Sequence, residues 1–166
     1  SFGVKTDGTL WGWGHNGNGN LGQNEGDGGG TGSYSSPVQI PGTTWSSDQD
    51  KWGGEFYGQL NIKTDGTLWG WGRNAGGILG QNQAPATRGG YSSPVQIPGT
   101  TWKYITGGGD GYAILATKTD GTLWSWGGND EGQLGLNNTT KYSSPVQIPG
   151  TTWNFVKSGN FGDRKS

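Results

Sequence analysis

The chain has 166 residues and a formal net charge of −1, from 11 basic and 12 acidic side chains, with 37 glycines, 10 tryptophans and no cysteine. Balanced charge without a basic stripe argues against nucleic acid as a partner, because phosphate binding needs a concentrated positive field. The lack of cysteine excludes disulfides and thiolate metal sites, and no apolar run approaches the ~20 residues of a membrane-spanning helix.

The first predicted element is a hairpin centred on Asp7-Gly8. Asp-Gly favours a type I′ turn, in which both central residues need positive φ, so it should join two antiparallel strands. In the strand that follows, residues 9–14 (TLWGWG) alternate with a period of two. Tryptophans therefore lie on one face and mostly glycines on the other. We expect the bare glycine face to admit large aromatic side chains of a neighbouring sheet.

A loop at 13–24 (WGHNGNGNLGQN) and a variable segment at 25–33 separate this hairpin from a short strand within SPVQIPG. We expect the loop asparagine, Asn16, to bond the backbone and so define the turn. Prolines bracket the strand at Pro37 and Pro41. Because proline cannot donate to a ladder, this strand should lie at the edge of a sheet.

The same sequence motifs occur twice more along the chain. Their period of ~55 residues is in the range of the repeats that form propeller blades. KTDGTLW begins at Lys5, Lys63 and Lys118, and each copy is followed by YSSPVQIPGTTW. Further strands are expected after Trp102 (WKYIT) and Trp153 (WNFVK), and before each Asp-Gly turn, as in YAILATK. Four short antiparallel strands per unit describe a β-propeller blade.

The expected fold class is therefore all-β, with three blades over approximately 5–62, 63–117 and 118–166 plus 1–4. Three blades do not close a ring, since propellers typically have about 4–8, so we expect part of a larger or oligomeric propeller. A chain that begins at Ser1 and contains no methionine is also expected to be a processed chain or an excerpt of a longer polypeptide.

Large aromatic side chains must supply most of the core, because only 28% of the residues are hydrophobic. We assign a structural core role to two tryptophans in each repeat: Trp11, Trp13, Trp69, Trp71, Trp124 and Trp126. Replacement of Trp13, Trp71 or Trp126 by alanine is expected to cost about 3–5 kcal/mol of stability each, as for other large-to-small aromatic changes.

Candidate ligand-binding residues lie where the repeats differ, because variable loops on a fixed scaffold carry binding functions. The repeats differ at 25–33, 83–90 and 138–141, and in 46–62 compared with 103–117. The candidates are His15, Arg73, Asp130, Glu131, Trp52 and Tyr57. Trp52 and Tyr57 could stack on a sugar ring, and packing of an irregular strand is the alternative interpretation.

No residue set suggests catalysis, and we expect no enzyme. His15 is replaced by Arg73 and Gly128 in the other repeats, which favours a solvated loop side chain over a catalytic base. Asp130-Glu131 is typical of surface charge, because glycoside hydrolysis needs two carboxylates that converge across a cleft. The glycine-rich stretches lack the patterns of phosphate or calcium loops, so no cofactor and no metal site is expected.

These phrases resemble the repeats of the regulator of chromosome condensation family, which carry a G-x-L-x-x-W-G strand, an N-x-x-G-x-L-G loop and a proline-containing strand. The resemblance spans nearly the whole chain in three in-phase copies. It implies a propeller, usually of seven blades. The sequences of the motifs are similar to those of tandem repeat arrays in bacterial and bacteriophage proteins. The nuclear member of this family acts as a nucleotide exchange factor for a small GTPase and binds chromatin.

We therefore expect a non-enzymatic structural or binding propeller of a bacteriophage virion or bacterial surface, with an extracellular or virion-surface location. Its expected partners are blades of the same or a neighbouring chain, and protein or glycan. The alternative is an intracellular regulatory scaffold, or a propeller similar to a GTPase exchange factor, in the cytoplasm.

Overall fold

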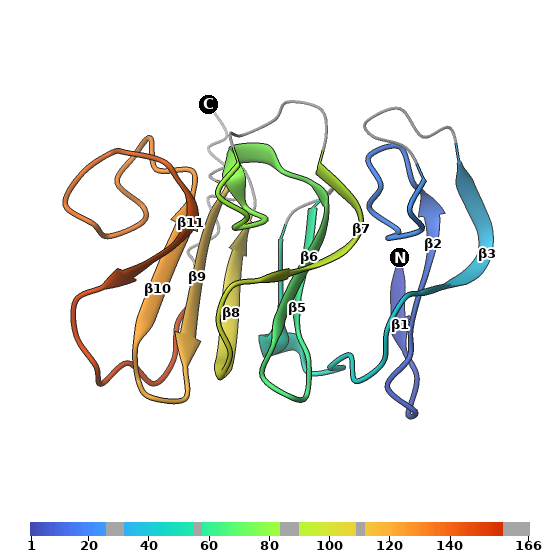
Figure 1. The fold of residues 1–166 in the computed structure, drawn as a ribbon, viewed down its shortest axis with the longest axis horizontal. Coiled ribbons are helices and arrows are strands. Elements are labelled where there is room, and N and C mark those ends of the chain that lie inside the picture. Colours follow the sequence, from blue (N-terminus) through green and yellow to red (C-terminus); the bar gives the residue numbers. More distant parts are fainter. Residues whose placement is uncertain (26–31, 55–57, 84–89, 109–111, 158–166) are drawn as a thin grey trace, which may run out of the picture.

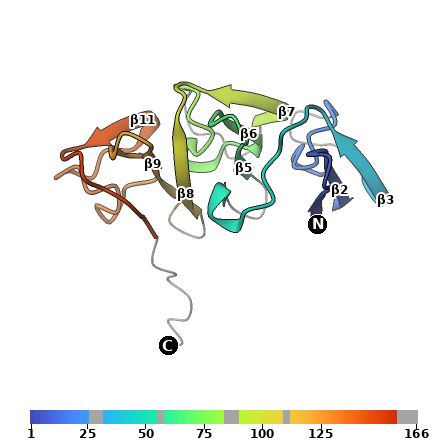
Figure 2. The same cartoon turned by 90° about the horizontal axis from the view of Figure 1, so that it is seen from below.

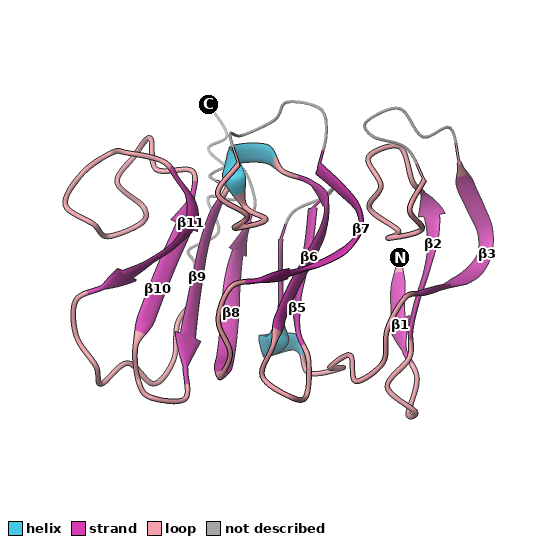
Figure 3. Ribbon diagram, viewed as in Figure 1, coloured by secondary structure: helices cyan, strands magenta, loops and turns pink. Residues whose placement is uncertain are grey.

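Three antiparallel β-sheets stand side by side in chain order (Figure 1) and together form an arc (Figure 2). The structure is a computed structural model that describes residues 1–25, 32–54, 58–83, 90–108 and 112–157. The described residues are mostly strands and loops, with two short 3₁₀ helices (Figure 3). The predicted all-β class is confirmed.

Each sheet is one blade, and its strands are arranged across the sheet in chain order. Blade I contains β1 (Phe2–Val4), β2 (Leu10–His15) and β3 (Ser33–Ile40). Blade II contains β4 (Trp52–Gly54), β5 (Gly58–Ile62), β6 (Leu68–Arg73) and β7 (Gly90–Ile97), with the 3₁₀ helices η1 (Gln49–Lys51) and η2 (Ala75–Gly77) beside them. Blade III contains β8 (Trp102–Gly108), β9 (Ala113–Lys118), β10 (Leu123–Gly127) and β11 (Tyr142–Ile148).

Blades II and III have the four predicted strands, whereas blade I has three. The strand expected after Trp102 is β8, which pairs with β9, and the proline-bounded strands β3, β7 and β11 lie at sheet edges as predicted. The segment after Trp153 was expected to be a strand, but the described residues 153–157 form none. The physical reason is pairing: β8 has β9 beside it, whereas residues 153–157 pair with no strand among the described residues.

The Asp-Gly turns differ from the type I′ turn that the dipeptide predicts. Gly8 has a φ of 77°, but Asp7 is not among the residues with positive φ. The Gly8 N–H donates to Lys5 O (2.9 Å), and the Lys5 N–H donates to Thr9 O (2.9 Å), which defines a longer hairpin loop that ends in one glycine. Asp7 favours this loop because its carboxylate accepts from the Thr9 N–H (3.0 Å) and hydroxyl (2.6 Å).

The core lies between the blades. One cluster joins blades I and II and consists of Leu10, Ile40, Trp45 and Trp71. The other joins blades II and III, and includes Leu60, Ile62, Leu68, Ile97, Trp102, Ile105, Ile114 and Trp126. In both clusters a sheet presents aliphatic side chains to the blade that follows it, and that blade contributes a buried tryptophan, Trp71 or Trp126.

The strand glycines serve a different contact from the one predicted. A Cβ added at Gly70 would lie 2.8 Å from Leu60 Cδ2 and 3.2 Å from Leu79 Cδ2, and both leucines belong to the same blade. The neighbouring blade's tryptophan instead approaches a loop glycine, because a Cβ at Gly80 would lie 3.3 Å from Trp126 Nε1. The strand glycine thus makes room for the leucine of its own loop.

Candidate interaction site

The arc has two rims of different character (Figure 1). One rim carries the three Asp-Gly turns, whose sequence is the same in every repeat. The other carries the loops that follow β2, β6 and β10. We call residues 15–25, 73–83 and 128–141 the variable rim. Of the stretches in which the repeats differ, residues 25, 83 and 138–141 belong to this rim, and residues 26–31 and 84–89 lie outside the described residues.

A buried asparagine shapes each loop of the variable rim. The side-chain Oδ1 accepts a hydrogen bond from the backbone N–H of the loop leucine five residues later. The distances are 2.9 Å for Asn16 to Leu21, 3.0 Å for Asn74 to Leu79 and 3.0 Å for Asn129 to Leu134. These bonds confirm the interpretation of the asparagines as turn-forming residues. Three loops of one shape can therefore present different side chains.

The charged and polar candidates lie at this rim on separate blades. His15 ends β2 and is exposed, and its Nδ1 accepts from the Gly17 N–H at 3.2 Å. Arg73 ends β6 and is half-buried. Asp130 is exposed and pairs with Lys141 Nζ at 2.9 Å, and Glu131 beside it is also exposed. These residues lie on one rim of three blades, which suits a broad contact surface, and their role in binding stays a prediction.

Of the two aromatic candidates, Tyr57 lies outside the described residues. Trp52 begins β4 and is half-buried. Its Nε1 donates to Ser46 O at 2.9 Å, and its ring meets that of Trp71 edge to face, with centroids 6.4 Å apart. These contacts show the Trp52 ring packed against its neighbours, which is the alternative that the sequence left open beside sugar stacking.

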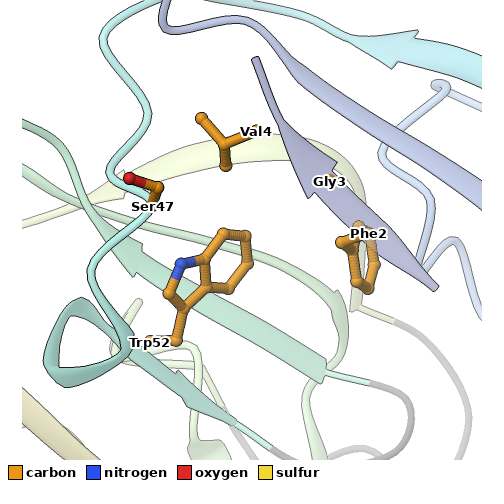
Figure 4. Close-up of a pocket in the computed structure, with 5 residues that line it drawn as sticks. All are labelled: Phe2, Gly3, Val4, Ser47 and Trp52. Carbon is orange, nitrogen blue, oxygen red and sulfur yellow. The ribbon is translucent and has the colours of Figure 1, made fainter. Parts of the chain in front are cut away.

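A hollow of about 380 Å³ lies between β1 and Trp52 (Figure 4). It is lined by Phe2, Gly3, Val4, Ser47 and Trp52. On the side of β1 away from β2, the described chain provides no further strand. The hollow therefore runs along an unpaired strand edge and has a mainly apolar lining.

The six tryptophans assigned to the core differ in their burial. Trp71 and Trp126 are fully buried at 0% exposure, because each packs against the preceding blade. Trp13, which has the equivalent position in blade I, is only half-buried, because no blade precedes blade I in the described chain. Trp11, Trp69 and Trp124 are also half-buried.

Sequence reasoning missed a cation site that joins neighbouring sequence repeats. The lysine of KTDGTLW lies between a tryptophan of its own blade and the tryptophan of the preceding PGTTW phrase. Lysine Nζ atoms lie 4.4 and 4.3 Å from the ring centroids of Trp45 and Trp69 for Lys63, and 4.6 and 4.4 Å from those of Trp102 and Trp124 for Lys118. Ammonium groups within ~6 Å of a ring face are attracted to it. The unchanged lysine and tryptophan in every repeat were the available signal.

Four of the titratable groups with shifted pKa values lie at the Asp-Gly rim, whereas Tyr34, whose pKa is raised by its hydrogen bond to Glu25, lies at the other rim. Hydrogen bonds from Thr67 lower the pKa of Asp65, and equivalent threonine bonds lower the pKa values of Asp7 and Asp120. Burial lowers the pKa of Lys63, and the nearby charge of Asp65 opposes that effect. The pKa shifts of the three aspartates thus come from the hydrogen bonds of the Asp-Gly turns, and that of Lys63 from its burial.

Within the described ranges, no three His, Cys, Asp or Glu side chains are grouped so that they could hold a metal ion. A search of the same residues finds no helix with the length and apolar character needed to cross a membrane.

The family model of the regulator of chromosome condensation (RCC1) repeat matches residues 120–163. This stretch contains the turn, loop and proline-bounded strand that recur in the other two units. Residues 120–163 thus match an RCC1 repeat, and the other two units resemble this repeat in sequence. Protein RCC2 of Homo sapiens is 37% identical over 92 residues, which cover 54% of this chain and 17% of that protein. RCC1 domain-containing protein RUG3, mitochondrial, of Arabidopsis thaliana is 30% identical over 91 residues, 53% of this chain and 20% of that protein.

Solved RCC1-type propellers share the fold. Prp20p of Saccharomyces cerevisiae, described with its binding properties to Gsp1p and histones, superposes with a TM-score of 0.72 at 19% identity, over 90% of this chain and 36% of that one. Yeast RCC1 (Prp20) bound to Kap60 superposes with a TM-score of 0.70 at 19% identity, over 90% of this chain and 35% of that one. Human WBSCR16 superposes with a TM-score of 0.62 at 20% identity, over 89% of this chain and 35% of that one. The RCC1 repeats described here therefore form part of a propeller, and span about a third of these chains.

The predicted extracellular or virion-surface location is wrong. One relative is described as mitochondrial, and Prp20p is described as binding histones, which are intracellular proteins. None of the relatives named above is described as a viral protein or as a glycan-binding protein. The comparisons show for this chain an RCC1 repeat at residues 120–163 and the fold of RCC1-type β-propellers.

Proposed function

We propose that these RCC1 repeats form a non-enzymatic, protein-binding module of an intracellular regulatory scaffold, and that the variable rim contacts the partner. The observation that carries this proposal is the contrast between the two rims. The loops of the variable rim share one backbone geometry, fixed by three buried asparagines, while the side chains at its surface change from blade to blade. Such a surface is typical of loops that bind on a rigid scaffold.

The relatives support a protein as the partner class. Prp20p is described as binding Gsp1p and histones, and a second structure holds it with Kap60. The surface of the chain suits a protein partner as well. His15, Asp130 and Glu131 are exposed on the variable rim, where they can form charged and polar contacts with a partner. Exposed charges of this kind give orientation and specificity to a protein interface.

Binding of two probes, a purified small GTPase of the Gsp1p kind and a histone dimer, can be measured by calorimetry. The test variant combines His15→Ala, Asp130→Ala and Glu131→Ala. The matched control combines Thr43→Ala, Thr100→Ala and Thr151→Ala, which are exposed residues of the opposite rim. We expect the test variant to weaken binding of at least one probe by about tenfold or more, and the control to bind like the natural sequence.

Equal losses in both variants, or no binding of either probe, would contradict the proposal. The release rate of labelled nucleotide from the GTPase adds a separate result. Accelerated release would assign exchange-factor activity to the module, whereas binding without acceleration would assign a scaffold role.

A further inference from the structure

The linker after each proline-bounded strand has the same sequence, PGTTW, in every repeat. Its tryptophan N–H donates to the glycine carbonyl of the Asp-Gly turn in the same repeat. The distances are 3.1 Å for Trp45 to Gly8, 3.0 Å for Trp102 to Gly66 and 3.0 Å for Trp153 to Gly121. The linker glycines also agree, with φ of 103° at Gly42, 104° at Gly99 and 113° at Gly150. Each linker is therefore attached to its own blade in the same way.

Two of the three linkers contain a threonine in an unfavourable backbone conformation. Thr44 has a φ of 64° and Thr101 a φ of 65°. In this left-handed region the Cβ atom lies too close to a carbonyl oxygen, and for a β-branched residue the conformation is a genuine outlier. Both threonines are exposed, so packing of their side chains does not compensate for the strain. Another contact must hold them in this conformation.

That contact is a hydrogen bond to the next blade. The Thr44 carbonyl accepts from the Thr64 N–H at 2.9 Å, and the Thr101 carbonyl accepts from the Thr119 N–H at 2.9 Å. Thr64 and Thr119 directly precede the Asp-Gly dipeptide of the repeat that follows. The strained conformation thus directs the linker carbonyl toward the turn of the next blade, across the junction between two blades.

The third linker shows the same sequence in another backbone conformation. Thr152 is not among the residues with positive φ, and no blade follows it in the described chain. A Cβ added at Gly121 would meet Thr151 O first. A Cβ added at Gly8 would instead meet the N and Cα atoms of Thr44 first. The linker therefore has two backbone states, and the strained state occurs where a blade is docked.

Strain in the linker opposes closure of the junction. When two blades separate, the linker threonine loses its bond to the next turn and is free to adopt the relaxed state that Thr152 shows. The release of strain lowers the free energy of the open state relative to the closed one. The open state is consequently more populated than it would be with an unstrained linker. Both strained linkers lie between blades that the structure describes.

We propose that each blade junction is a hinge, and that strain in the linker threonine, Thr44 or Thr101, favours its opening. Hinges are a few loop residues that absorb large changes in φ and ψ, and the linker threonine has two such states. Opening between blades II and III changes the spacing of two loops of the variable rim, 73–83 and 128–141. The hinge does not depend on which residues bind a partner, so it stands or falls separately from the proposed function.

Hydrogen exchange of the Thr119 amide in the free chain tests the hinge between blades II and III, because this N–H bonds to Thr101 O across the junction. Asparagine tolerates the left-handed region. Thr101→Asn should therefore remove strain from the closed state and slow exchange of the Thr119 amide by roughly tenfold. Thr101→Val keeps the β-branched shape, and with it the strain, so it should not slow exchange.

The matched control is Thr100→Asn, which makes the same change at an exposed neighbour in the same linker that has no positive φ. The Thr64 amide, at the junction between blades I and II, is the internal reference. We expect slower exchange of the Thr119 amide in Thr101→Asn alone, and an unchanged Thr64 amide in every variant. Unchanged exchange of the Thr119 amide in Thr101→Asn would overturn the proposal. Equal slowing in Thr101→Val, in Thr100→Asn or at Thr64 would overturn it as well, because the effect would then not come from strain at one junction.

Discussion

Replacement of Trp126 by alanine should destabilise the chain by about 3–5 kcal/mol, the cost of removing a buried aromatic side chain and leaving a cavity. Trp126 has 0% exposure and packs in the cluster between blades II and III. Its Nε1 also donates to Ile78 O at 2.8 Å, so the change leaves a buried carbonyl without this partner and adds about 1 kcal/mol or more. The loss should therefore lie at the upper end of the range.

Trp13→Ala is the matched comparison, because Trp13 has the same place in blade I but is half-buried. The sequence alone predicts equal costs for the two tryptophans. The structure instead predicts roughly 1–2 kcal/mol for Trp13, in proportion to the smaller apolar area that it buries.

Urea denaturation followed by circular dichroism gives the free energy of unfolding of each variant. A loss for Trp13→Ala equal to that for Trp126→Ala would refute the argument that burial at a blade interface, rather than membership of the repeat, decides the cost. A loss below about 1 kcal/mol for Trp126→Ala would refute the account of the core itself.

Three further changes test the turns and loops. Asn129→Ala should cost about 1–3 kcal/mol in urea denaturation, because a buried loop N–H loses its acceptor, and an unchanged midpoint would contradict this. Gly70→Ala should cost about 1–3 kcal/mol by the same assay, because the new Cβ would lie 2.8 Å from Leu60 Cδ2, and a neutral effect would show that this leucine shifts freely. Bonds from Thr67 lower the pKa of Asp65 from 3.8, so the stabilisation is present above that pH and is lost as the pH falls through the folded-state pKa. Asp65→Asn should therefore flatten the fall in melting temperature between neutral pH and about pH 2, and an unaltered fall would contradict the assignment.

Much of the fold could be predicted from the sequence because its signals are local. Each Asp-Gly dipeptide lies in a hairpin, and each proline-bounded strand lies at a sheet edge. The asparagine loops were also predictable, since Asn16 and its equivalents bond to a backbone N–H only five residues away. Repetition strengthened these signals. A residue type that is kept at the same position in all three repeats indicates a structural role for that position, even without other sequences for comparison.

Side-chain bonds within the turns and contacts between repeats account for what the sequence did not predict. The turn type depends on the carboxylate of Asp7 bonding to Thr9, which favours a longer loop than the dipeptide alone suggests. The unequal burial of Trp13 and Trp71 depends on whether a blade precedes each of them. The two tryptophans lie in identical sequence motifs, so the motif does not predict this difference. The pairing of Lys63 with Trp45 joins two repeats, so comparison of single repeats does not show it.

For the candidate site, the sequence located the variable segments but not how they are arranged. His15, Arg73 and Asp130 occur in loops of three different units, and only the order of the blades places these loops on one rim. Which of them contacts a partner depends on the partner, and this information is not contained in the fold.

The most direct test of the account is hydrogen exchange of the backbone amides, with and without a GTPase of the Gsp1p kind and, separately, a histone dimer. The account predicts that a bound partner slows exchange in loops 16–24, 74–82 and 129–137, and leaves the turns at 6–9, 64–67 and 119–122 unchanged. Slower exchange at the Asp-Gly turns alone, or no change with either probe, would contradict the claim that these RCC1 repeats bind protein through their variable rim.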